Sequence, residues 1–239
     1  MNAANVRAIS DLRRQAWIAW AGRRLAWLAA GVLAFSGPAM GADGQSIVMQ
    51  GNGKGAPACM ACHGARGQGN PAGGFPMLAG MSETYLAKQL HDFQNGTRTN
   101  ATMGPIAKAL SPQEVQAVAR YFSQQTPPGK APGATAGSDL VREGRNLVHN
   151  GEWGKSLPAC VRCHGPGAHG IAPHFPPIAG QGAGYLEKQL KAFQNGTRRN
   201  DAGEMMRSVA DRLTATQIKA VAEYLASRSP QVGDASSAQ

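Results

Sequence analysis

The sequence has few aromatic residues, few strand-favouring residues and no long uninterrupted apolar run. Aromatic side chains make up 6% of the 239 residues. Ala, Gln, Lys, Leu and Met recur between glycines and prolines, a composition that favours short helices separated by structured loops. We therefore expect an all-α fold, and the length suits one large domain or two small ones.

The basic charge of the chain is concentrated at its N-terminus. The formal net charge is +10, but five arginines and one aspartate lie within residues 1–41, so the remainder carries only +6. That remainder has no long Lys/Arg run and none interleaved with aromatic residues, which is the pattern typical of nucleic-acid binding. We therefore expect no nucleic-acid partner.

Residues 1–41 have the order of an export signal. Arginines precede the apolar run "LAWLAAGVLAF" at 25–35, and the small residues of "SGPAMG" follow it, with cleavage expected after Gly41. Eleven apolar residues are too few to span a bilayer. An uncleaved anchor that also uses "AWIAW" at 16–20 is the alternative, weakened by the interrupting Arg23 and Arg24. Membrane association therefore stays open at this point.

The rest of the chain repeats itself with a period near 100 residues. "PACMACHG" at 57–64 returns as "PACVRCHG" at 158–165, and "YLAKQLHDFQNGTRTN" at 85–100 returns as "YLEKQLKAFQNGTRRN" at 185–200. Two domains of one fold are predicted. The predicted divisions are domain 1 at 43–126, a Pro/Gly/Ala-rich linker at 127–137, domain 2 at 138–229 and a disordered tail at 230–239.

Each repeat predicts the same helices. A short helix carries the cysteines, and a longer one ends at an Asn-Gly pair that can form its C-cap. Ser111 with Glu114, and Thr214 with Gln217, have the spacing of a capping box at the start of the last helix. The helix that ends at Asn-Gly is expected at 83–94 and 183–194, and a first helix is expected at 44–50 and 138–149.

All four cysteines lie in two C-x-x-C-H motifs. Two thiols one helical turn apart can form thioethers with the two vinyl groups of a haem, while the following imidazole reaches the iron. The duplication of this motif behind an export signal predicts two covalently attached haem c groups. The predicted attachment and ligand residues are Cys59, Cys62 and His63 in the first repeat, and Cys160, Cys163 and His164 in the second.

Three other uses of the cysteines fit the sequence less well. A zinc site needs four closely spaced ligands, but each repeat offers two cysteines and one nearby histidine. A thioredoxin-like site needs a strand-rich setting. Disulfides within C-x-x-C would be tight and would leave both histidines unexplained.

A methionine is the expected ligand on the other face of each iron, because a soft, neutral thioether favours the ferrous form. Met103 lies seven residues before Leu110, and Met206 lies seven before Leu213. The repeat therefore selects Met206 and leaves Met205 as a neighbour. Both selected methionines lie in segments that we expect to be polar loops.

Other roles stay open for several of these residues. Met103 and Met206 could instead fill a core. His169 and His174, in the loop after the second motif, could compete for the second iron. Histidines in a loop without a counterpart in the other repeat are more often surface side chains that bind no metal.

Two pairs of recurring cations lie near the methionine segments. Arg98 and Arg198 could stabilise haem propionates, or could be solvated or brace a loop. Lys88 and Lys188 recur on an otherwise polar helix and favour a solvated face.

The ordered set of motifs resembles the dihaem cytochrome c4 family, built from two tandem class I cytochrome c domains. The set is C-x-x-C-H-G, F-P-x-L/I-A-G, Y-L-x-K-Q-L-x-x-F-x-x-G-T-R-x-N, a methionine and a capped helix, all found twice. The resemblance implies that Pro76 and Pro176 offer their carbonyls to His63 and His164. It also implies two haems packed across a pseudo-two-fold interface.

The resemblance further implies a periplasmic protein that carries single electrons between membrane redox complexes. The donor would be a quinol-oxidising complex and the acceptor a terminal oxidase. A cytochrome subunit of a periplasmic dehydrogenase is the alternative. A haem enzyme, such as a dihaem peroxidase or a thiol-oxidising dehydrogenase, needs an open iron, against which the paired methionines argue. We therefore expect no catalysis. The second methionine segment is three residues longer, which puts equal haem potentials in doubt.

Overall fold

The computed structural model describes residues 42–129 and 138–230. The predicted export signal lies outside these residues, as do most of the predicted linker and tail. Within the described residues, none of the helices combines the length and the apolar character that crossing a membrane requires.

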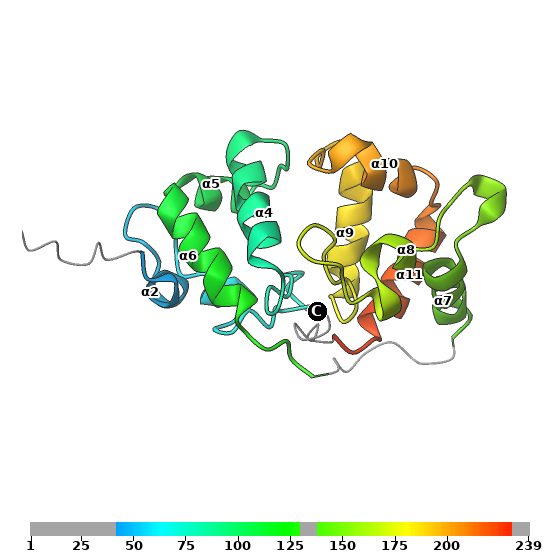
Figure 1. Ribbon diagram of the computed structural model, residues 1–239, viewed down its shortest axis with the longest axis horizontal. Coiled ribbons are helices and arrows are strands. Elements are labelled where there is room, and N and C mark those ends of the chain that lie inside the picture. Colours follow the sequence, from blue (N-terminus) through cyan, green and yellow to red (C-terminus); the bar gives the residue numbers. More distant parts are fainter. Residues whose placement is uncertain (1–41, 130–137, 231–239) are drawn as a thin grey trace, which may run out of the picture. The chain divides into compact units, whose positions relative to one another are not determined.

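Both repeats are helical, and their elements follow the same order (Figure 1). Among the described residues, β-structure is limited to isolated bridges, which confirms the all-α prediction. The first repeat contains α2 (Gly44–Gln50), α3 (Met60–His63), α4 (Glu83–Asn95), α5 (Met103–Lys108) and α6 (Pro112–Ser123). The second contains α7 (Asp139–Asn150), η1 (Trp153–Lys155), α8 (Val161–His164), η2 (Pro166–Ala168), α9 (Ala183–Gln194), η3 (Ala202–Glu204), α10 (Met205–Ala210) and α11 (Ala215–Ala226).

Several helices begin or end at the capping residues that the sequence predicts. Ser111 accepts a hydrogen bond from the Glu114 amide, and the Glu114 carboxylate accepts one from the Ser111 amide, so α6 begins with the predicted capping box. Thr214 and Gln217 form the same box in α11. Gly96 ends α4 in the left-handed conformation, as predicted.

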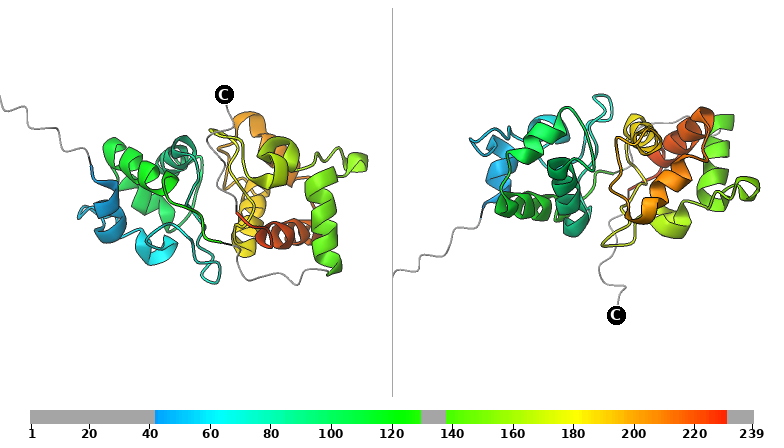
Figure 2. Two further views of the ribbon diagram at one scale, coloured as in Figure 1. Left: turned by 60° about the horizontal axis from the view of Figure 1, so that its bottom comes forward. Right: turned by 90° about the horizontal axis from the view of Figure 1, so that it is seen from above.

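Each repeat has its own apolar core, built around its last helix. In α6, Val115, Val118 and Phe122 are buried on one face and pack with residues of α2 and α4. In α11, Ile218 and Leu225 have the corresponding role against α7 and α9. The views of Figure 2 show α4 and α6 packed together in one group of helices and α9 and α11 packed together in the other.

A glycine lets the first and last helices of each repeat cross at close range. A β-carbon on Gly44 would lie 2.2 Å from the carbonyl oxygen of Ala117, and one on Gly144 would lie 2.0 Å from that of Ala220. These distances are far below van der Waals contact, so only glycine fits at either crossing. Both positions recur at a spacing of 100 residues, yet periodicity alone does not show what they touch.

Replacing Gly144 with alanine should push α7 away from α11. We expect a loss of about 1–3 kcal/mol in the free energy of unfolding, as is typical of overpacked cores. Urea unfolding followed by circular dichroism would measure it. Gly154→Ala is the matched control, because a β-carbon there meets no atom within 4 Å, and it should change stability by less than about 0.5 kcal/mol. Equal stability of the two variants would contradict the crossing.

The expected polar loops around the methionines are in fact the starts of short helices. Met103 is the first residue of α5, and Met206 is the second residue of α10. Asn100 accepts hydrogen bonds from the amides of Thr102 and Met103, which supplies acceptors at the start of α5. Asp201 accepts one from the Arg207 amide in α10. The loop prediction was wrong because these polar side chains hydrogen-bond to the starts of the helices.

Candidate haem-binding sites

Each C-x-x-C-H motif forms a single helical turn. The His63 amide donates to the Cys59 carbonyl over 3.0 Å, and the His164 amide donates to the Cys160 carbonyl over 2.9 Å. The turn places the two thiols of a motif and the imidazole that follows on one short element. No disulfide joins the four cysteines, so all of their sulfur atoms are available for thioether bonds.

The imidazole of each motif is oriented by a backbone carbonyl. His63 Nδ1 lies 3.0 Å from the Pro76 oxygen, and His164 Nδ1 lies 2.8 Å from the Pro176 oxygen. A carbonyl can only accept, so Nδ1 carries the proton and Nε2 keeps its lone pair for a metal. This confirms the contacts with the two prolines. Burial lowers the pKa of both imidazoles, although the proline carbonyls oppose the shift, so both favour the neutral form that binds iron.

A cavity of about 510 Å³ brings the predicted residues of the first repeat together. Cys59, Cys62, His63 and Met103 all line it. Its remaining walls include apolar side chains from α4, α5 and α6, among them Leu86, Phe93, Ile106, Val118 and Phe122. Two thiols, an imidazole and a thioether around an apolar chamber fit a covalently attached haem with one ligand on each face. The bound haem would supply a one-electron Fe(III)/Fe(II) couple.

The thiols themselves fit a haem better than a zinc ion. Burial raises the pKa of Cys59, and raises that of Cys160 to about 11, so both are neutral thiols at neutral pH. A structural zinc site needs four ligands, whereas each motif offers two thiols and one imidazole. In the part of the chain that the structure describes, no cluster of three or more His, Cys, Asp or Glu side chains could hold a metal ion.

The second methionine segment keeps the register of the first. Gln94 donates to the carbonyls of Ala107 and Leu110, and Gln194 donates in the same way to those of Ala210 and Leu213. Counting back four residues from the alanine of each pair gives position 103 in the first repeat and position 206 in the second.

The exposure of the two adjacent methionines also favours Met206 over Met205. Met205 is 45% exposed, whereas Met206 is partly buried. Of the competing histidines, His174 is exposed and His169 is partly buried in the loop after α8. Met206 therefore remains the predicted ligand of the second iron.

Replacing Met206 with alanine should remove one of two His/Met signatures. The near-infrared absorption of the ferric protein, which reports a thioether bound to low-spin iron, should fall by about half. Met103→Ala should remove the other half. Met205→Ala is the matched control and should keep the full band. If Met205→Ala loses the band and Met206→Ala keeps it, the register of the second segment is wrong.

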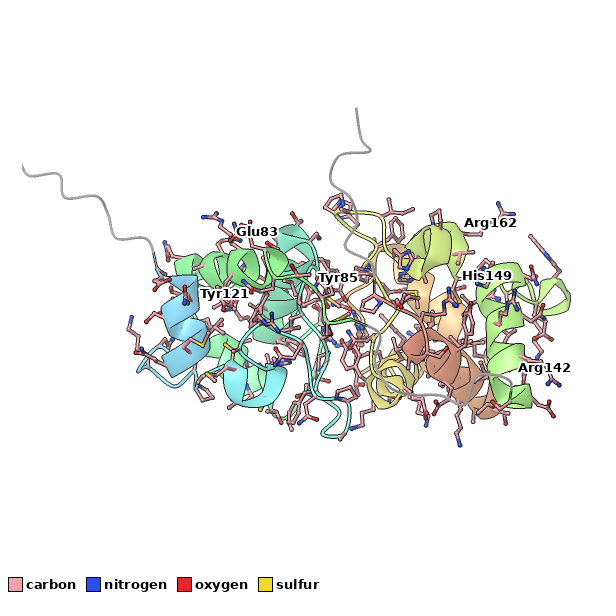
Figure 3. The ribbon with its side chains drawn as sticks, turned by 90° about the horizontal axis from the view of Figure 1, so that it is seen from below. Glu83, Tyr85, Tyr121, Arg142, His149 and Arg162 are labelled. Atoms are coloured by element: carbon pink, nitrogen blue, oxygen red, sulfur yellow. The ribbon has the colours of Figure 1, made fainter. Side chains whose placement is uncertain are left out.

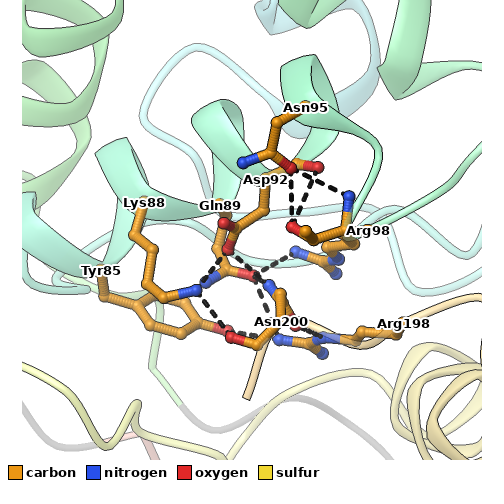
Figure 4. A network of polar contacts seen from close by, with 9 residues as sticks. Tyr85, Lys88, Gln89, Asp92, Asn95, Arg98, Arg198 and Asn200 are labelled. Atoms are coloured by element: carbon orange, nitrogen blue, oxygen red, sulfur yellow. Dashed lines mark hydrogen bonds and ion pairs between the residues drawn. The ribbon is translucent and has the colours of Figure 1, made fainter. Parts of the chain in front are cut away.

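Two arginines link the repeats through a buried polar network (Figure 4). Arg98 is 7% exposed and Arg198 is 8% exposed, so neither is the solvated side chain that one interpretation allowed. Arg98 donates to Gln89 of its own repeat, and to Gln189 and Tyr185 of the other.

Arg198 mirrors this arrangement from the second repeat. It donates to Gln189 of its own repeat, and to Gln89 and Tyr85 of the first. Figure 3 labels Tyr85 among the side chains between the two groups of helices. Burial by itself lowers the pKa of Arg98, but the charges of nearby tyrosines and of Asp92 outweigh it, so the net pKa is raised. The Arg98 guanidinium therefore stays charged.

Both arginines also line the first cavity, together with Tyr185 and Gln189 of the second repeat. A buried guanidinium without a carboxylate partner in its hydrogen-bond set can attract the acid groups of a bound haem. The tyrosines and glutamines of the network were missed from the sequence. Their recurrence in "YLAKQL" and "YLEKQL" was the available signal.

Two helical repeats, each with a thiol pair, an oriented imidazole and a methionine at the start of a short helix, define the architecture of a tandem c-type cytochrome. Comparison with known proteins gives the same class of protein. The model of the cytochrome c family matches residues 42–126 and 141–229. A thiosulfate dehydrogenase electron acceptor of Thiomonas intermedia is 48% identical over 173 residues, which are 72% of this chain and 79% of the relative. The cytochrome c4 of Pseudomonas aeruginosa is 41% identical over 172 residues, covering 71% and 83%.

Solved structures give the same result. Reduced recombinant cytochrome c4 from Pseudomonas stutzeri matches with a TM-score of 0.68 and 34% identity, covering 77% of this chain and 96% of that one. Thiosulfate dehydrogenase from Marichromatium purpuratum matches with a TM-score of 0.73 and 39% identity, covering 80% of this chain but only 40% of that one.

The chain belongs to the cytochrome c family, and within it to the dihaem electron carriers of the cytochrome c4 type. It carries two covalently bound haem c groups, attached in its two C-x-x-C-H motifs. The positions of the domain boundaries stay predictions.

Proposed function

We propose that the protein is a periplasmic carrier that passes single electrons between redox proteins without catalysing a reaction itself. The iron ligands are His63 and Met103 in the first domain, and His164 and Met206 in the second. The observation that carries this proposal is the first cavity, where thiols, imidazole and methionine surround one apolar chamber. An iron with a protein ligand on each face offers no open position to a substrate.

The residues around each iron do three things in this proposal. The proline carbonyl holds the proton on Nδ1 of the imidazole, so that Nε2 would be free to bind the iron. The apolar walls keep water away from the porphyrin, which limits the reorganisation that accompanies a change of charge. The arginines at the repeat junction, which line the first cavity, would bind the acid groups of the haem.

A dehydrogenase is the electron donor that the comparisons favour. The relatives at 48% and 44% identity are both named electron acceptors of thiosulfate dehydrogenase, and a structural match is titled thiosulfate dehydrogenase. A quinol-oxidising donor and a terminal oxidase acceptor form the second candidate, supported by the relatives named cytochrome c4.

Reduction kinetics can distinguish these two candidate electron donors. The oxidised protein is mixed with thiosulfate alone, with thiosulfate and a purified thiosulfate dehydrogenase, or with a quinol and a purified quinol-oxidising complex. Haem reduction is followed by absorbance. We expect rapid reduction of both haems when the dehydrogenase is present, and no turnover with thiosulfate alone. Rapid reduction only in the quinol mixture would support the second candidate. Catalytic consumption of thiosulfate by the protein alone would overturn the carrier proposal.

A further inference from the structure

The residue types that form the polar network recur in both repeats, except at one buried acid. The arginines, glutamines and tyrosines all have counterparts 100 residues away. Asp92 does not, because Ala192 stands at its place in the second repeat. Asp92 is 7% exposed, so its charge is poorly screened by water.

Asp92 contacts the second repeat just before the segment of the second methionine. Its Oδ2 accepts from the Nδ2 of Asn200 over 2.7 Å and from the Nζ of Lys88 over 2.5 Å (Figure 4). Lys88 also donates to the Asn200 carbonyl over 2.7 Å. This side of the junction therefore carries a buried acid beside a half-exposed lysine.

The equivalent position on the other side faces the first haem cavity. Ala192 and Lys188 both line that cavity, together with Asn100, the counterpart of Asn200. The two repeats exchange equivalent contacts through Arg98 and Arg198, which hydrogen-bond to the same residue types of the opposite repeat. By this near-symmetry, Asp92 faces the haem site of the second repeat as Ala192 faces that of the first.

Lys188 also has different contacts from Lys88. Its Nζ lies beside Gly74 of the first repeat, 3.1 Å from where a β-carbon would stand. Four residues further along its helix is Ala192, so α9 offers Lys188 no carboxylate at the spacing that pairs Lys88 with Asp92. Both sides of the junction therefore carry the lysine, but only the side of Lys88 also carries the acid, which gives that side one more negative charge. Since Lys188 is exposed, water screens its charge, and the buried acid is the stronger influence.

We propose that the single substitution of acid for alanine between the repeats sets the order of the two haem potentials. A negative charge stabilises the more positive ferric state, so Asp92 lowers the potential of the second haem relative to the first. A single electron added to the oxidised protein then settles on the first haem. This inference rests on the proposed His/Met carrier, because it needs both irons to be closed and reversible.

The test measures the two potentials separately in the full-length holoprotein. Potentiometric titration is followed by NMR, with each haem assigned through the methionine methyl signal that disappears in Met103→Ala or Met206→Ala. In the unaltered protein, we expect the first haem to have the higher potential. Asp92→Asn keeps the side-chain size and removes the charge, so it should raise the potential of the second haem and narrow the gap.

Three further variants separate charge from structural damage. Asp92→Ala should shift the second haem in the same direction as Asp92→Asn. The reciprocal Ala192→Asp should lower the potential of the first haem. Glu143→Gln removes an exposed acid on α7 and should leave both potentials unchanged. The inference would be overturned if the difference between the two haem potentials were the same in Asp92→Asn as in the unaltered protein. It would also be overturned if Asp92→Asn shifted the potential of the first haem more than that of the second. If the unaltered protein lacks two His/Met haems, the proposed function fails instead.

Discussion

The structure depends on two buried guanidiniums that each need the other repeat to satisfy their hydrogen bonds. Arg98 and Arg198 are almost inaccessible to water, and a buried charge without partners would cost several kcal/mol. Each finds a glutamine in its own repeat and a glutamine and tyrosine in the other. Neither repeat can bury its arginine in this way alone, so the network favours a fixed junction.

The backbone strengthens this junction and brings it close to the haem sites. Thr99 and Arg199 donate their amides to the carbonyls of Thr197 and Thr97, across the bridge formed by the two arginines. Gln181 is 2% exposed, and its amide group binds both the amide and the carbonyl of Met77, next to the proline that orients His63. The contacts that join the repeats therefore also position a predicted iron ligand.

The sequence predicted the parts of the molecule whose partners are local. The cysteine motifs, the capping boxes at Ser111 and Thr214 and the Asn-Gly helix ends depend on residues a few positions apart, so spacing alone reveals them. The repeat also indicated which methionine to choose. The glycine crossing at Gly144 was missed because the atom it meets lies 76 residues away, and recurrence shows only that a position is shared. Arg98 was left undecided for the same reason, since its partners belong to the other repeat.

We expect the two haems, held by the junction between the repeats, to exchange electrons within one chain. NMR of the half-reduced protein tests it most directly, because electron exchange between the two singly reduced forms broadens or merges the signals of each haem. If the junction holds the haems together, the exchange rate should not change when the protein is diluted. A rate that falls in proportion to protein concentration would mean that electrons pass between molecules, and would contradict the account.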